Sequence, residues 1–150
     1  MSSVQFAPML SVRDAAAAMT WYQTSLGAVE TMRLVDPSGV IVHGELTIGQ
    51  TLIMLFDESS HPNSSPDSLG GTPVVLHLLY SDGVDEAFAR VLSGGASVVF
   101  PLKDQFYGYR AGRVRDPFGH EWILSQKMQD LTPQEMQHRF DELLAQNAAE

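Results

Sequence analysis

Two histidines and two glutamates stand where strand alternation could bring them to one surface. His43 and Glu45 occupy alternate positions of the segment 42–48, so a strand there would project both from the same face. His77 lies within the apolar run 74–80, and Glu121 begins the run 121–125. A carboxylate beside an imidazole suits proton transfer near neutral pH, and two histidines with one carboxylate suit Fe(II) or Zn²⁺. The pattern therefore indicates acid–base chemistry or a metal site.

Each of these residues also has a structural interpretation. A histidine in an apolar strand, such as His77, is often held by a hydrogen bond within the sheet. His43 and Glu45 would contribute little as a partly exposed pair at a sheet rim. Glu121 directly follows a turn and could be solvated. The sequence leaves both interpretations open for all four residues.

A second group of side chains suits a planar or amphipathic ligand. The segment 104–110 combines three aromatic rings, an amide and a guanidinium, which lie at Gln105, Phe106, Tyr107, Tyr109 and Arg110. Aromatic bodies with polar ends are common in small-molecule pockets. Met54 and Phe56 would add an apolar wall. The alternative is a surface loop held in place by its aromatic rings.

An internal repeat indicates how these residues are positioned. The segment from Asp14 to Ala28 is echoed at a constant offset by the segment from Asp82 to Ala96. Each copy is followed by three strand-like runs, so we expect two units of order βαβββ, at about 4–57 and 73–127, joined by a polar connector at 58–72. Repeated units bury their apolar faces against each other, and pockets form where units meet.

The expected elements follow from apolar periodicity and turn residues. In the first unit they are a strand at 4–12, a helix at 14–26 and strands at 28–35, 40–48 and 51–56. In the second they are a strand at 74–80, a helix near 84–92 and strands near 96–100, 109–115 and 121–125. Thr132, Pro133 and Glu135 form a capping box that starts a C-terminal helix at about 132–148.

The composition limits the classes of function. A chain of 150 residues with 44% hydrophobic residues is long enough for a single domain with its own core. The absence of cysteine excludes disulfides, thiolate metal sites and cysteine nucleophiles. A net charge of −9 argues against nucleic acid as a partner. No apolar run is long enough to span a membrane, so we expect a cytoplasmic protein with no membrane partner.

Several motifs resemble one known superfamily. They are Trp21-Tyr22 with Leu26-Gly27-Ala28, Leu69-Gly70-Gly71-Thr72-Pro73, and Asp116-Pro117-Phe118-Gly119-His120-Glu121-Trp122. Together with the paired units they resemble the vicinal oxygen chelate superfamily (glyoxalase I, bleomycin-resistance proteins and extradiol dioxygenases), and more narrowly its PhnB-like branch. The resemblance implies an α+β fold in which paired βαβββ modules form a cup-shaped half-barrel, with a C-terminal helix added.

The resemblance also identifies the positions that hold a metal in metal-dependent members. These positions carry Ala7, Met54, Val75 and Ile123 here. None offers an oxygen or nitrogen donor, which divalent cations of this kind require. We therefore expect no metal at this site and no cofactor.

The favoured hypothesis is a metal-independent protein that binds a small amphipathic or aromatic ligand in the inter-module cup, near His43, Glu45, His77, Glu121 and the segment 104–110. The alternative is a lyase, isomerase or oxygenase. It would use a displaced metal site of His43, Glu45 and His77, or metal-free acid–base chemistry by Glu45 or Glu121. A third possibility is an interaction module. We expect a homodimer, because paired modules leave sheet edges that a second chain can complete.

Overall fold

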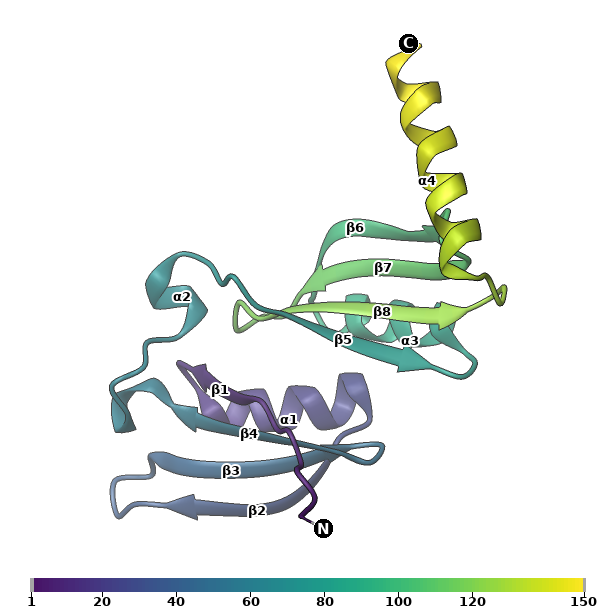
Figure 1. Cartoon of the computed structure of the whole chain (residues 1–150). Coiled ribbons are helices and arrows are strands. Elements are labelled where there is room, and N and C mark those ends of the chain that lie inside the picture. The colour runs from purple at the N-terminus through teal and green to yellow at the C-terminus, as the bar shows by residue number, and fades with distance from the viewer. Residues whose placement is uncertain (1, 150) are drawn as a thin grey trace.

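The computed structural model describes residues 2–149 and contains two four-stranded mixed sheets (Figure 1). The first sheet has the order β1-β4-β3-β2, with β1 at Met9–Val12, β2 at Val29–Val35, β3 at Ile41–Ile48 and β4 at Thr51–Asp57. The second has the order β5-β8-β7-β6, with β5 at Val75–Tyr80, β6 at Ser97–Asp104, β7 at Tyr109–Arg115 and β8 at Glu121–Lys127. In each sheet the first strand pairs in parallel with the last strand, and the other pairs are antiparallel.

One helix belongs to each sheet, and together they make two modules. Helix α1 (Ala15–Leu26) follows β1, and α3 (Val84–Ser93) follows β5. Asp14 caps α1 by accepting a hydrogen bond from the Ala17 N–H, and Gly27 ends the helix in the left-handed conformation. Module 1 is β1–β4 with α1, and module 2 is β5–β8 with α3. The predicted paired βαβββ modules and C-terminal helix are confirmed.

Each helix covers only one face of its sheet. Leu46, Ile53 and Leu55 alternate with more exposed residues and lie in the core with α1. Trp122 and Leu124 do the same beneath α3. Figure 1 shows both helices behind their sheets. We call the opposite side of each sheet, which turns away from its helix, the outer face.

A buried aspartate ties the two modules together. The hydroxyl of Tyr22 in α1 donates to Oδ2 of Asp116 at 2.6 Å, and the Trp122 Nε1–H donates to the same oxygen at 2.9 Å. Oδ1 accepts from the backbone N–H groups of Phe118 and His120. Burial, followed by the charge of Asp116, raises the pKa of Tyr22 well above its ordinary value. Asp116 therefore links α1 of module 1 to the turn that precedes β8 in module 2, and α1 also packs against α3.

The largest departures from the predicted bounds occur in two strands. The first begins at Met9 rather than at Val4. Pro8 has no N–H to donate to the neighbouring strand β4, so regular pairing begins only after it. The Pro8 carbonyl still accepts a hydrogen bond from the Met54 N–H. Strand β6 ends at Asp104 rather than at Phe100. Its pairing with β7 contains two register shifts, which let the strand continue although its apolar residues do not alternate regularly.

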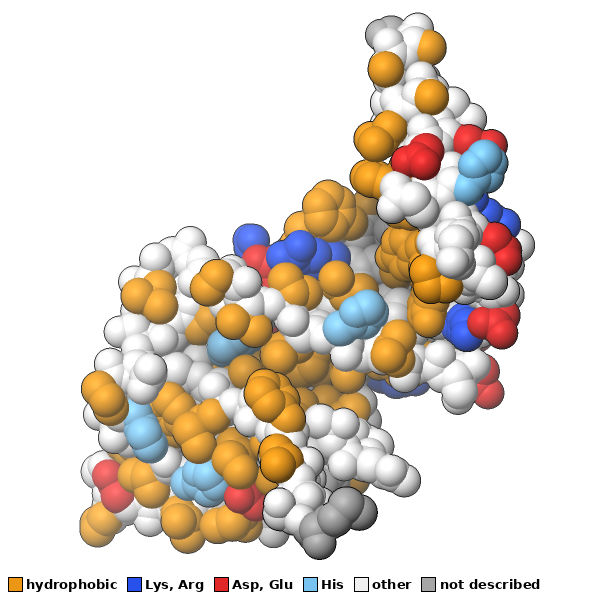
Figure 2. Space-filling model, viewed as in Figure 1, with side chains coloured by type: hydrophobic (Ala, Val, Ile, Leu, Met, Phe, Trp, Pro, Cys, Tyr) orange, Lys and Arg blue, Asp and Glu red, His pale blue; other side chains and the backbone are white. Residues whose placement is uncertain are grey.

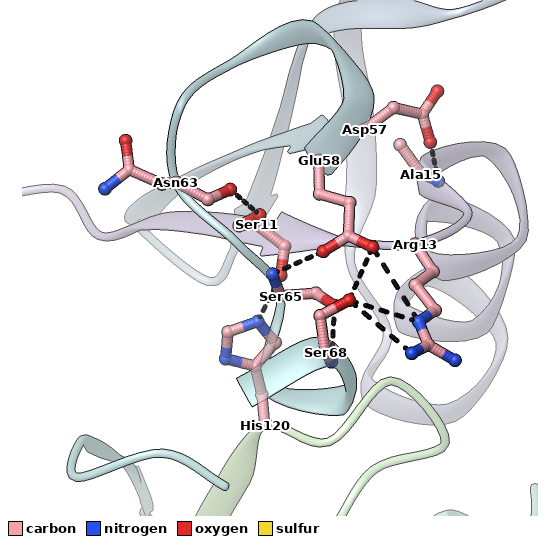
Figure 3. Close-up of polar contacts among 9 residues, drawn as sticks. All are labelled: Ser11, Arg13, Ala15, Asp57, Glu58, Asn63, Ser65, Ser68 and His120. Atoms are coloured by element: carbon pink, nitrogen blue, oxygen red, sulfur yellow. Dashed lines mark hydrogen bonds and ion pairs between the residues drawn. The ribbon is translucent and has the colours of Figure 1, made fainter. Parts of the chain in front are cut away.

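The connector between the modules is folded rather than extended. It contains the 3₁₀ turn η1 (Glu58–Ser60) and the short helix α2 (Pro66–Leu69). The Glu58 carboxylate accepts from the Ser65 backbone N–H at 2.6 Å and from the Ser68 hydroxyl at 2.8 Å (Figure 3). These bonds, led by the one from Ser65, lower the pKa of Glu58. The connector is therefore a fixed wall beside module 1.

The C-terminal helix α4 (Pro133–Ala148) extends away from both modules (Figure 1). The N-cap of the predicted capping box forms: the Thr132 hydroxyl accepts from the Glu135 N–H and donates to the Glu135 carboxylate at 3.1 Å. None of its described residues is buried. Its first half contacts the body, where Phe140 stacks on Phe106 and Arg139 bonds to Gln129.

Candidate ligand-binding site

A pocket of about 280 Å³ opens on the outer face of the second sheet. Strand alternation places Arg113 of β7 on this face, opposite Ile123 of β8 in the antiparallel register. The irregular register of β6 brings the Phe100 ring to 6.0 Å from the Arg113 guanidinium. The pocket is lined by Phe100, Pro101, Lys103, Gln105, Tyr107, Ala111, Gly112, Arg113 and Ile123.

The Arg113 guanidinium is held in place by a buried carboxylate. Its Nε donates to Oε1 of Glu121 at 2.9 Å, and Nη2 of Arg115 lies 3.5 Å from Oε2. Glu121 is only 7% exposed, so the solvated interpretation is wrong for this residue. Both of its oxygens accept hydrogen bonds from arginines, so Glu121 positions a cation rather than acting as a free base.

The outer face of the second sheet is positively charged in an acidic protein. Arg113 and Arg115 pair with the single carboxylate of Glu121 there, and Lys103 also lines the pocket, whereas the whole chain has a net charge of −9. Figure 2 shows basic side chains bordered by apolar ones over this part of the molecule. Such a combination favours a ligand with an apolar body and an anionic group.

The aromatic segment 104–110 is divided between the pocket and other contacts. Gln105 and Tyr107 line the pocket, and the Gln105 amide is fixed by donating to the Ala111 carbonyl at 3.1 Å. Partial burial raises the pKa of Tyr107. Phe106 holds α4, and Tyr109 borders a separate hollow next to Arg139. Arg110 instead bonds to Asp85 and Asp104.

The histidines predicted for the site do not come together. His43 and Glu45 form a pair on the outer face of the first sheet, with Nε2 and Oε1 3.1 Å apart. His77 lies in the other sheet, where its Nε2 is 2.7 Å from the Ser125 hydroxyl. Among residues 2–149, no three His, Asp or Glu side chains are placed to hold a metal ion. The displaced metal site that would combine His43, Glu45 and His77 is therefore not formed within the chain.

The remaining predicted pocket residues lie in module 1. Met54 and Phe56 are on β4, on the same side of the first sheet as Glu45. The Phe56 ring packs on His61 with a centroid distance of 4.0 Å. The structure thus divides the predicted residues between two separate faces.

The four positions that the resemblance assigns to a metal lack suitable donors in the folded chain. Ile123 lies beside His77 in the parallel pair of β5 and β8, and Met54 lies beside Met9. Among the side chains of Ala7, Met54, Val75 and Ile123, the only heteroatom is the thioether sulfur of Met54. Hard and borderline cations prefer oxygen and nitrogen. The residues present at these positions therefore do not fit the metal.

Sequence reasoning missed the residues that define this pocket. These residues are Arg113, Lys103 and Phe100. Arg113 and Arg115 alternate along a strand and share a face with Glu121 in the adjacent strand. That alternation was the available signal. Pairing strands 109–115 and 121–125 by their turn would have predicted the Arg113–Glu121 contact.

Comparison with known proteins identifies the fold family. Residues 5–124 match the Glyoxalase/Bleomycin resistance protein/Dioxygenase superfamily. The chain belongs to this superfamily. The uncharacterized protein Mb0911c of Mycobacterium bovis is 42% identical to this glyoxalase-superfamily chain over 134 residues, covering 87% of this chain and 88% of that protein.

Solved structures of the superfamily share the same architecture. TioX from Micromonospora sp. ML1 is 29% identical, and its crystal structure matches with a TM-score of 0.63 over 86% of this chain and 100% of TioX. The PhnB protein from Bacillus cereus is 18% identical, with a TM-score of 0.63 over 83% of this chain and 99% of that one. The PhnB-like resemblance is therefore confirmed at the level of the fold. Among the described residues, no helix is long and apolar enough to cross a membrane.

Proposed function

We propose that this superfamily member is a metal-independent binding protein for small aromatic anions. The ring would lie against Phe100 and Ile123, and the anionic group would face Arg113. The observation that carries the proposal is the guanidinium of Arg113, held by the buried Glu121 inside a pocket with aromatic and apolar walls.

The hydrogen-bonding capacity of Arg113 supports an anionic ligand. A guanidinium has five N–H donors, and the bond to Glu121 uses the one on Nε. The terminal nitrogens remain for a carboxylate, which arginine can bind through two parallel hydrogen bonds. Because Glu121 fixes the guanidinium before binding, less conformational entropy is lost when the ligand arrives.

Benzoate and benzamide provide a direct test, because they have nearly the same shape but differ in charge. We expect benzoate to bind to protein treated with EDTA about tenfold more tightly than benzamide, since hydrogen bonds to charged groups contribute about 1.5 to 3 kcal/mol. Isothermal titration calorimetry measures both affinities. Equal affinities, or benzoate binding that appears only after a divalent metal is added, would overturn the proposal.

We also propose that a second copy of the chain covers the outer faces. Large apolar side chains are exposed on or beside them, including Leu34, Leu79 and Phe100. On α4, Leu143 and Leu144 are exposed as well, and monomers rarely leave such surface open over several elements. A two-fold pair would cover both sheets at once and exclude water from the pocket.

The oligomeric state is therefore expected to be a dimer at micromolar concentrations. Light scattering coupled to gel filtration should give twice the chain mass of 16.5 kDa. A mass of 16.5 kDa across the micromolar range would show that the outer faces stay open in solution.

A further inference from the structure

A second cavity, of about 300 Å³, lies where module 1, the connector and module 2 meet. Met9 and Phe56 of the first sheet form one side, and Pro66 and Leu69 of α2 form another. His120, which precedes β8, completes it from module 2. This cavity shares no lining residue with the pocket that contains Arg113.

The walls of this cavity are fixed by packing and hydrogen bonds. The Glu58 contacts hold Ser65 and Ser68 at the start of α2 (Figure 3). On the other side, the turn before β8 packs directly on α2, because a Cβ added to Gly119 would lie 2.8 Å from Cβ of Pro66. The Ser11 hydroxyl donates to the Asn63 carbonyl at 2.7 Å, which ties the connector to β1.

His120 presents one unused acceptor here. The residue is 9% exposed, and its Nε2 lies 2.9 Å from the Ser11 backbone oxygen (Figure 3). Because a carbonyl oxygen only accepts, Nε2 carries the hydrogen, and Nδ1 of the neutral ring keeps its lone pair. Among residues 2–149, every fully buried side-chain nitrogen or oxygen has a hydrogen-bond partner. Nδ1 of His120 has none within that range, so it is not fully buried. Nδ1 is therefore accessible, and the cavity is the space that His120 borders.

We propose that this cavity is a second binding site, which takes a small uncharged molecule with an apolar body and one hydrogen-bond donor, such as a phenol. The hydroxyl donates to Nδ1 of His120, and the ring lies among Met9, Phe56 and Leu69. None of the described residues that line the cavity is a lysine or an arginine, so a neutral ligand is favoured here over the anion expected at Arg113. The two sites therefore differ in the charge that they accept.

The test compares phenol with anisole, which keeps the ring but lacks the hydroxyl hydrogen. In protein with ¹⁵N-labelled histidine, we expect phenol to shift the assigned Nδ1 resonance of His120 in a saturable manner. Anisole should bind about fivefold more weakly, as the loss of one ordinary hydrogen bond implies, and should leave that resonance in place. Equal affinities, shifts confined to other histidines, or no saturable binding would each overturn the proposal.

A variant and a competition experiment separate this site from the one at Arg113. His120→Phe keeps a ring but removes the acceptor, so phenol should bind to it no more tightly than anisole does. If that variant does not fold, the wild-type comparison still decides. Saturating phenol should leave the benzoate affinity unchanged, and a competitive loss of benzoate binding would show that phenol occupies the pocket at Arg113 instead.

Discussion

Replacing Asp116 by alanine is expected to lower the free energy of unfolding by about 3 to 5 kcal/mol. The substitution leaves the Tyr22 hydroxyl and the Trp122 indole N–H buried without their acceptor. It also removes the bond that joins Tyr22 in α1 of module 1 to the turn before β8, and the two bonds within that turn. Urea denaturation followed by tryptophan fluorescence measures the loss.

The chain contains a matched control for this prediction. Asp36 occupies the same position in a second Asp-Pro-x-Gly turn, where its Oδ1 accepts from the N–H groups of Ser38 and Val40. It makes no contact with the other module among the described hydrogen bonds. Asp36→Ala should therefore cost much less. Similar losses for the two variants would mean that Asp116 stabilises only its own turn.

Replacing Arg113 by glutamine is expected to weaken benzoate binding about tenfold and to leave benzamide binding nearly unchanged. Glutamine can still donate to Glu121, which limits structural damage, but it cannot pair with an anion as a guanidinium does. Calorimetric titration of both ligands separates the loss of charge from a loss of packing.

Arg33→Gln is the matched control for the loss of one positive charge. Arg33 is also paired with a glutamate, since its Nη2 lies 2.7 Å from Oε1 of Glu30, but it belongs to the first sheet. Its replacement should not change benzoate affinity. If both variants weakened binding equally, benzoate would be responding to net charge rather than to the pocket.

The architecture could be predicted from sequence because its signals are local. Side chains alternate between the two faces of a strand, which places Leu46 and Trp122 in the core and Glu45 and Ile123 on the outer faces. The internal repeat predicts two similar modules. The C-terminal helix followed from its capping box. Each of these signals lies within a few residues.

The grouping of the site residues could not be predicted in the same way. Whether His43 and His77 meet depends on how the modules pack, and that packing is anchored by the Tyr22–Asp116 bond between residues far apart in the sequence. The sequence predicts only a turn role for Asp116, since its bonds to Tyr22 and Trp122 depend on the folded neighbours. His120 likewise stands out in the sequence only as part of a motif, because its partner is a backbone carbonyl with no sequence signature.

The location of a bound aromatic anion is the most direct test of the proposed function. Crystals of metal-free protein soaked with 4-bromobenzoate would show the bromine by anomalous diffraction. We predict bromine over the second sheet, close to Phe100 and Ile123, with the carboxylate hydrogen-bonded to Arg113. Bromine found only in the cavity beside His120, or only on the outer face of the first sheet, would contradict the account.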